Sequence, residues 1–142
     1  MEEKVLKIFT DGGSRGNPGP AAAGIIITQG DRELFKGGKY LGIVTNNIAE
    51  YKGVLLALNW LIANKTSLRF SEVIIVMDSE LIVKQIRGEY KVKDEKLKTL
   101  HTEALAKLNQ LKIPYSFQHV LRDKNKIADK IVNQVLDREI KK

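Results

Sequence analysis

The feature that most constrains the fold of this chain is an unbroken apolar run, Val73-Ile74-Ile75-Val76-Met77, which is closed by Asp78. A strand that is apolar on both faces usually lies inside a sheet that other elements cover. The run therefore predicts an interior strand, and it predicts that the carboxylate of Asp78 stands at the end of that strand.

The order of the remaining segments predicts an α/β fold. Three apolar stretches joined by short turns precede the run, and they predict an antiparallel meander of strands over residues 5–9, 21–28 and 34–42. Helices are expected from Thr45 to the segment Asn64-Lys65-Thr66 and over 79–86, 94–111 and 126–140, and a last strand over 115–122. This order indicates a mixed sheet with helices packed on it.

Length and composition favour one domain inside the cell. A chain of 142 residues can bury a core of its own, so we expect a single domain over residues 1–142. The chain lacks the run of roughly 20 apolar residues that a membrane-spanning helix needs, and it lacks an apolar signal-peptide region. It also contains no cysteine, which excludes disulfides and thiolate metal sites. We therefore expect a cytoplasmic monomer that does not associate with membranes.

The net charge of +7 is unevenly distributed along the chain. Residues 1–83 contain nine basic and nine acidic side chains, whereas residues 84–142 contain fifteen and eight. A basic region combined with a group of acids suggests a polyanionic substrate held near a metal site. A charged surface that only keeps the protein soluble would have the same composition.

A glycine-rich stretch from Thr10 to Gly19 separates the first two predicted strands. We expect Asp11 at the exit of the first strand, where its carboxylate is rigidly aimed. We expect the glycines beside it to let a ligand approach the main chain. Glycine, asparagine and proline also make ordinary hairpin loops, in which an Asp often begins the turn. The stretch alone leaves both interpretations open.

Three further acids occupy comparable positions: Asp78 ends a strand, Glu50 lies in the first turns of a helix, and Asp129 lies early in the last helix. If the strands of Asp11 and Asp78 are neighbours, their carboxylates raise each other's pKa unless a cation compensates them. Carboxylate oxygens are ligands that Mg²⁺ prefers, and a pair of such ions can promote phosphodiester cleavage. Ordinary turn and helix-terminus roles would also explain each acid separately.

Four short motifs occur in an order that resembles type 1 ribonuclease H over nearly the whole chain. The motifs are Phe9-Thr10-Asp11-Gly12-Gly13-Ser14, Thr45-Asn46-Asn47-Ile48-Ala49-Glu50-Tyr51, Val76-Met77-Asp78-Ser79 and Asn125-Lys126-Ile127-Ala128-Asp129. The resemblance implies a ribonuclease H-like fold. That fold is a five-stranded mixed sheet flanked by helices, with strands one to three antiparallel and strands four and five parallel to strand one.

The resemblance also implies an activity, which is hydrolysis of the RNA strand of RNA–DNA hybrids to leave 5′-phosphate and 3′-hydroxyl ends. It implies two Mg²⁺ ions, or Mn²⁺, bound together with the substrate. The metal-binding catalytic set carried over from the family is Asp11, Glu50, Asp78 and Asp129.

Residues beside two of these acids fall where the family contacts nucleic acid. The implied RNA-strand contacts are Gly12, Gly13, Ser14, Asn17, Asn46 and Asn47, and Thr45 falls where the family binds a phosphate of the DNA strand. Backbone amides and Asn side chains supply the donors and acceptors that recognise a 2′-hydroxyl. Asn46 and Asn47 would equally serve to cap a helix.

The chain departs from many family members in two ways. An additional basic helix is absent, because residues 88–93 run directly into the next helix. Lys84, Arg87, Lys91 and Lys93 would replace part of its charge, or they are simply solvated. The loop before Asp129 also lacks a histidine. We expect His119 to be structural, about 10 Å back from the strand end, and Arg122 to hold the scissile or leaving phosphate instead.

Two other functions remain open from the sequence. One is a ribonuclease H-fold module that binds nucleic acid without cleaving it, although the intact set of four acids argues against it. The other is a nuclease that also acts on double-stranded RNA, because groups that recognise 2′-hydroxyls do not exclude a duplex of two RNA strands.

Overall fold

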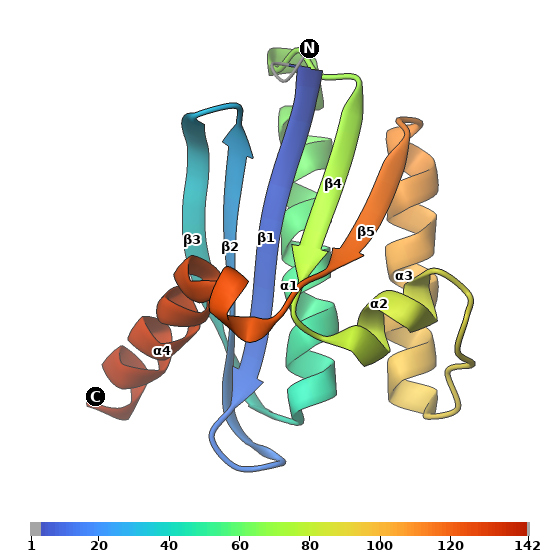
Figure 1. The fold of residues 1–142 in the computed structure, drawn as a ribbon. Helices are drawn as coiled ribbons and strands as arrows, with labels where there is room; N and C mark the ends of the chain where they lie inside the picture. Colours follow the sequence, from blue (N-terminus) through green and yellow to red (C-terminus); the bar gives the residue numbers. More distant parts are fainter. Residues whose placement is uncertain (1–3, 142) are drawn as a thin grey trace.

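The computed structural model describes residues 4–141 and contains one five-stranded sheet in the order β3-β2-β1-β4-β5 (Figure 1). The strands are β1 (Val5–Ser14), β2 (Gly19–Gln29), β3 (Arg32–Val44), β4 (Glu72–Met77) and β5 (Tyr115–His119). Strands β1 to β3 pair antiparallel, whereas β4 is parallel to both β1 and β5. The predicted sheet is confirmed, and the apolar run that ends at Met77 forms an interior strand.

Four α-helices and two short 3₁₀ turns complete the fold. The α-helices are α1 (Asn46–Asn64), α2 (Glu80–Ile86), α3 (Glu95–Leu111) and α4 (Lys126–Ile140), and the 3₁₀ turns are η2 (Lys65–Ser67) and η3 (Arg122–Lys124). Their bounds agree closely with the helices predicted from apolar periodicity. No helix within residues 4–141 is long and apolar enough to cross a membrane.

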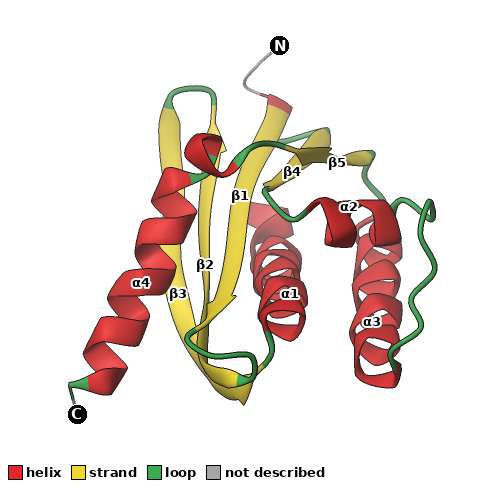
Figure 2. Cartoon of the chain, turned by 60° about the horizontal axis from the view of Figure 1, so that its bottom comes forward, coloured by secondary structure: helices red, strands yellow, loops and turns green. Residues whose placement is uncertain are grey.

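The two faces of the sheet are covered very differently. Helices α1 and α3 lie on one side, and α4 lies on the other, as Figure 2 shows. The α1 side holds a large core in which the apolar side chains of β1 and β2 pack against α1. Each fully buried Leu, Ile or Val there contributes roughly 1.5–3 kcal/mol. The α4 side has a much smaller buried cluster, namely Ala22, Ile131, Val132, Val135 and Leu136.

Two strand boundaries differ from the sequence prediction. Strand β1 does not end before Asp11 but continues to Ser14, because Gly12–Ser14 remain paired with the small residues Ala21–Ala23 of β2. Strand β5 ends at His119 rather than at residue 122. Its parallel partner β4 ends at Met77, whose carbonyl accepts the last bond from Val120. The chain then turns into η3.

Candidate metal and nucleic-acid site

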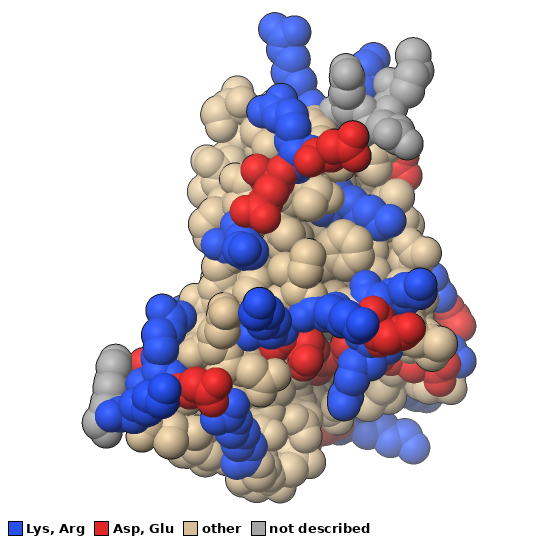
Figure 3. Space-filling view, turned by 60° about the vertical axis from the view of Figure 1, so that its left-hand side comes forward, with Lys and Arg blue, Asp and Glu red and all other residues tan. Residues whose placement is uncertain are grey.

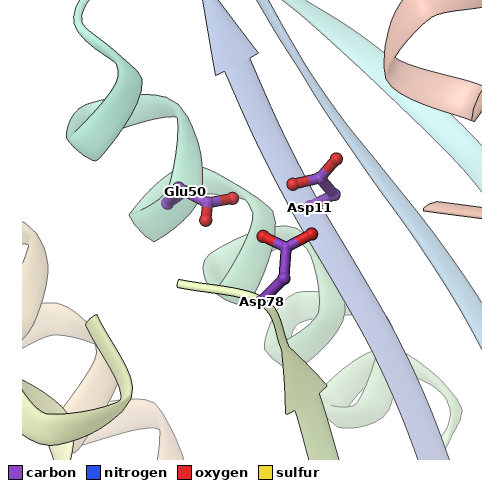
Figure 4. Close-up of side chains that lie close together, drawn as sticks. All are labelled: Asp11, Glu50 and Asp78. Atoms are coloured by element: carbon purple, nitrogen blue, oxygen red, sulfur yellow. The ribbon is translucent and has the colours of Figure 1, made fainter. Parts of the chain in front are cut away.

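Three carboxylates from three different elements converge toward the C-terminal end of β1. Asp11 lies on β1, Glu50 on α1 and Asp78 directly after β4, and one oxygen of each lies within 4.8 Å of the other two (Figure 4). The last parallel pair between β1 and β4 joins Phe9 to Val76. Asp11 and Asp78 both lie two residues beyond that pair, so the strand register brings them together.

Two glycines let α1 bring Glu50 to the same point. A Cβ at Gly12 would lie 2.3 Å from the backbone of Ala49, and one at Gly53 would lie 3.0 Å from the carbonyl oxygen of Asp11. The Gly12 amide donates a 2.5 Å hydrogen bond to Glu50 Oε1. The space beside Gly12 is therefore filled by the helix, and the expectation that this glycine leaves room for a ligand is wrong.

The carboxylates destabilise one another's charge in the absence of a cation. Burial, followed by the charge of Asp78, raises the pKa of Asp11 to about 7. Burial and then the charge of Asp11 raise the pKa of Glu50 well above its ordinary value. The pKa of Asp78 is also raised by burial, although a hydrogen bond from Asn125 and the charge of Arg122 oppose that rise. Two of the three are almost inaccessible to water, with Asp11 6% and Glu50 7% exposed.

This donor set fits a hard divalent cation. It offers carboxylate oxygens at short mutual distance, and three negative charges in a poorly solvated place have no buried basic partner among the described residues. Mg²⁺ and Mn²⁺ favour such oxygen ligands. A bound cation would remove the repulsion that raises the three pKa values.

Asp129 stands apart from the three clustered acids. It is half-buried in the first turn of α4 and is not part of the group whose oxygens lie within 4.8 Å of one another. Its charge nevertheless raises the pKa of Asp11 and of Asp78, after the larger effect of burial on each. The structure thus brings Asp129 near the cluster without making it a member.

Asn125 connects the cluster to α4, a role that its place in a motif does not reveal. Its side chain is 1% exposed, and its amide donates to the Thr10 carbonyl at 2.8 Å and to Asp78 Oδ2 at 3.4 Å. An Asn directly before a helix usually caps that helix, but the side chain of Asn125 makes no capping bond. No local pattern distinguishes this use of an Asn from ordinary capping.

The residues expected to contact nucleic acid form a connected group beside the cluster. The Ser14 amide donates to Asn46 Oδ1 at 2.9 Å, and the Asn46 amide donates to Asn17 Oδ1 at 3.0 Å. Thr45 caps α1 by accepting from the Ile48 amide. A groove of about 610 Å³ separates Asn17, Thr45 and Asn47 from the start of α3. A Cβ at Gly13 would lie 3.4 Å from the Val132 side chain of α4.

Known proteins share this fold and much of this sequence. A family model described as Reverse transcriptase-like matches residues 9–135. Ribonuclease HI of Halobacterium salinarum is 35% identical over 130 residues, which cover 91% of this chain and 63% of that protein. The crystal structure of LC11-RNase H1 in complex with RNA/DNA hybrid matches with a TM-score of 0.83 and 41% identity, covering 95% of this chain and 99% of that chain.

The chain belongs to the type 1 ribonuclease H family. The bifunctional protein Rv2228c of Mycobacterium tuberculosis is also 36% identical over 132 residues, covering 92% of this chain but only 35% of that protein. The chain therefore spans about a third of the mycobacterial relative and less than two thirds of the ribonuclease HI.

The basic side chains near α2 of this ribonuclease H-like chain fall into two groups. Arg87 donates to the Phe117 carbonyl and pairs with Glu89 at 3.7 Å, and Lys84 lies over the ring of Tyr90. Lys91 and Lys93 lie in the loop between α2 and α3 and make no ion pair with any described residue. Of the four cations named from the sequence, these two lysines keep an unpaired charge.

His119 and Arg122 both lie near Asp78, which corrects one prediction. His119 is the last residue of β5 and pairs with Met77, so the expectation that it stands about 10 Å back from the strand end is wrong. Arg122 lies in the η3 turn rather than at the end of a strand. Burial raises the pKa of Asp78, and the charges of Arg122 and, less strongly, His119 oppose that rise.

Proposed function

We propose that this chain is a metal-dependent endoribonuclease that hydrolyses the RNA strand of RNA–DNA hybrids and leaves 5′-phosphate and 3′-hydroxyl ends. The observation that carries the proposal is the convergence of Asp11, Glu50 and Asp78 within 4.8 Å. The similarity to an RNase H1 whose crystal structure contains an RNA/DNA hybrid supports the choice of substrate.

Asp11, Glu50 and Asp78 would hold two divalent cations, Mg²⁺ or Mn²⁺, with Asp129 as a fourth ligand when substrate is present. Bound cations of this kind activate a water nucleophile and stabilise the leaving oxygen. The chain's own contribution is to fix the ligands: the register of β1 and β4 sets Asp11 against Asp78, and the Gly12 amide orients Glu50. Asn125 orients Asp78 and links it to α4.

Recognition of the RNA strand would fall to the group around the start of α1. In Asn17 and Asn46 the side-chain oxygen already accepts a backbone hydrogen bond, which directs each Nδ2 donor elsewhere. These donors suit the 2′-hydroxyls and base edges of RNA. Ser14, Gly13 and Asn47 would extend the contact with the RNA strand. Gly12 would contribute only by fixing the position of Glu50. Thr45 would bind a phosphate of the DNA strand.

Arg122 would stabilise the charge of the scissile or leaving phosphate. It is exposed beside Asp78, and a guanidinium stays charged and offers paired donors that suit phosphate geometry. The charge of His119 opposes the rise in the pKa of Asp78 less strongly than that of Arg122. We therefore assign the electrostatic role to Arg122 first and to His119 second.

A single gel separates this function from its two alternatives. End-labelled RNA–DNA hybrid, double-stranded RNA and double-stranded DNA are incubated with the protein, with Mg²⁺ and with EDTA. We expect cleavage of the RNA strand of the hybrid that requires Mg²⁺. Cleavage of the RNA duplex at a comparable rate would favour the broader nuclease, and binding of the hybrid without any cleavage would favour the inactive module. An Asp78→Asn variant controls for contaminating nuclease.

A further inference from the structure

Asn125, which donates a hydrogen bond to Asp78, also lines a cavity. It has a volume of about 280 Å³ and lies between the outer face of β1 and β2 and the segment from η3 into α4. Its residues are Phe9, Ile26, Thr28, Asp123, Lys124, Asn125, Lys126, Ile127 and Ala128. None of them is among the acids or the nucleic-acid contacts assigned above, apart from the tether Asn125.

The floor of this cavity is apolar, and one of its walls carries an exposed apolar side chain. Phe9 and Ile26 are paired neighbours on β1 and β2, and they form its floor. Ile127 stands opposite, in the first turn of α4, and is 52% exposed although it is a large apolar side chain. Flat apolar ligands, such as the faces of nucleobases, gain binding energy from surfaces of this kind.

Two lysines beside the cavity suit a ligand that carries an anion, although the lining also includes the carboxylate of Asp123. Asn125 lines the cavity too, but its Oδ1 atom, which has no hydrogen-bond partner among the described residues, is closed to solvent. Because this Asn does not cap α4, the first N–H groups of that helix also lack a side-chain acceptor. Lys124 and Lys126 are exposed at the cavity and form no ion pair within residues 4–141.

The cavity also lies within reach of a strand bound at the catalytic cluster. Phe9 and Asp11 are two residues apart on β1 and share a face of the sheet, which places them about 7 Å apart along the strand. The face toward β3 and α4 carries more Lys and Arg than Asp and Glu (Figure 3). A polyanion that leaves the cluster on this side would therefore meet a favourable surface.

We propose that this cavity binds one nucleotide of an unpaired strand that extends from the hybrid. The base lies between Phe9 and Ile127, and the phosphate lies between Lys124, Lys126 and the first turn of α4. This inference rests on the proposed function only for the choice of a hybrid as the molecule that carries the unpaired strand.

The first test measures binding in EDTA, so that cleavage plays no part. The probes are a blunt RNA–DNA hybrid and the same hybrid with a four-nucleotide DNA extension at the 5′ or the 3′ end, with 2-aminopurine in the extension. We expect at least one extension to tighten binding about fivefold or more. Ile127→Glu, which puts a carboxylate in the wall, should remove that gain. Equal affinity of the wild type for blunt and extended hybrids would overturn the proposal.

A matched control lies on the same helix. Ile140 is 57% exposed at the far end of α4, so Ile140→Glu adds the same charge to the same helix away from the cavity. It should keep the gain from the extension, and both variants should cleave blunt hybrid as the wild type does. If Ile127→Glu kept the gain, or if Ile140→Glu lost it equally, the cavity would not be the binding site.

A second test separates the nucleotide from its parts. Adenosine monophosphate, ribose 5-phosphate and inorganic phosphate are each titrated into the labelled wild-type protein, and the amide resonances of Ile127 and Ala128 are followed by NMR. Saturable shifts only with the nucleotide support the proposal, whereas equal shifts with phosphate indicate an anion site without a place for the base. Nucleotide binding in a protein that fails to cleave hybrid would contradict the proposed function and leave this site intact.

Discussion

The acids of the site are supported by very different amounts of packing on the two faces of the sheet. Asp11, Glu50 and Asp78 belong to elements that pack into the large core beneath α1, and strand register and helix contact leave them little freedom. Asp129 belongs to α4, which rests on a cluster of five buried apolar residues. The difference indicates that three of the acids are set in place by the fold, whereas the position of the fourth depends on how α4 is attached.

Two polar tethers supplement the small apolar contact of α4. Asn125 fixes its start to the Thr10 carbonyl and to Asp78. Arg15, in the turn between β1 and β2, donates to Asn133 Oδ1 at 3.2 Å and pairs with Asp137 at 2.8 Å. The second tether is partly exposed, and exposed ion pairs contribute only about 0–1 kcal/mol. The position of Asp129 therefore depends mainly on Asn125 and on the buried face of α4.

The largest effect should come from removing a firmly held acid. Asp78→Asn should lower hybrid cleavage below a few per cent of the wild-type rate and leave hybrid binding nearly unchanged, because most of the affinity comes from phosphate contacts. Asp129→Asn should cost less, about tenfold. Single-turnover kinetics with a hybrid in Mg²⁺ measure both rates. Equal losses would mean that substrate and metal draw Asp129 fully into the cluster, and substantial activity in Asp78→Asn would defeat the assignment.

A smaller effect should follow from removing the basic side chains beside Asp78. Arg122→Ala should lower the turnover rate about tenfold, a loss of about 1.4 kcal/mol of transition-state stabilisation. His119→Ala should cost less, because the charge of His119 has the weaker influence on Asp78. The two kcat values, measured at a temperature where circular dichroism shows both variants folded, test this order. A crippled His119 variant beside a nearly normal Arg122 variant would reverse the two roles.

The lysines outside the acidic cluster should affect the affinity for the hybrid rather than the rate of cleavage. Replacing Lys91 and Lys93 with alanine should weaken hybrid binding and reduce the slope of log affinity against log salt by up to about 2, because each lost phosphate contact releases fewer counterions. Fluorescence anisotropy in EDTA at several salt concentrations measures this slope. Replacing Lys84, which already lies over Tyr90, should change it less. An unchanged slope in the double variant would show that these lysines point away from the hybrid.

The smallest effect is on the free energy of unfolding, and it comes from the repulsion between the buried carboxylates of the cluster. The pKa of Asp11 is raised from 3.8 to about 7, so the folded state binds more protons than the unfolded state between these values. The free energy of unfolding contributed by this group therefore falls as the pH rises from about 4 to about 7. In EDTA at pH 8, Asp11→Asn should melt about 2–4 °C above the wild type.

The pH dependence of that difference provides the control. The gain in melting temperature should shrink toward pH 4 and disappear well below pH 3.8, where Asp11 is protonated in both states. Mg²⁺ should raise the melting temperature of the wild type more than that of the variant. A gain that is independent of pH would show that Asp11→Asn stabilises the protein by better packing and not by relieving repulsion.

Much of the secondary structure and the identity of the acids could be predicted from the sequence. The helices follow from apolar periodicity, and Thr45 before α1 caps that helix, as a Thr at this position commonly does. The interior position of the run ending at Met77 follows from its uniform apolarity. These features are local, because each depends on the residue types within one element and on the face that the element must bury.

Other features depend on contacts between distant segments, and only the tertiary structure decided them. The length of β1 beyond Asp11 depends on Ala21–Ala23 of β2, and the end of β5 depends on where β4 stops. Three other features depend on how the helices pack on the two faces of the sheet. Gly12 makes room for α1, Asn125 joins α4 to Asp78, and Asp129 stands apart from the other acids. Residue types predict which groups are able to act, but register and packing determine which of them meet.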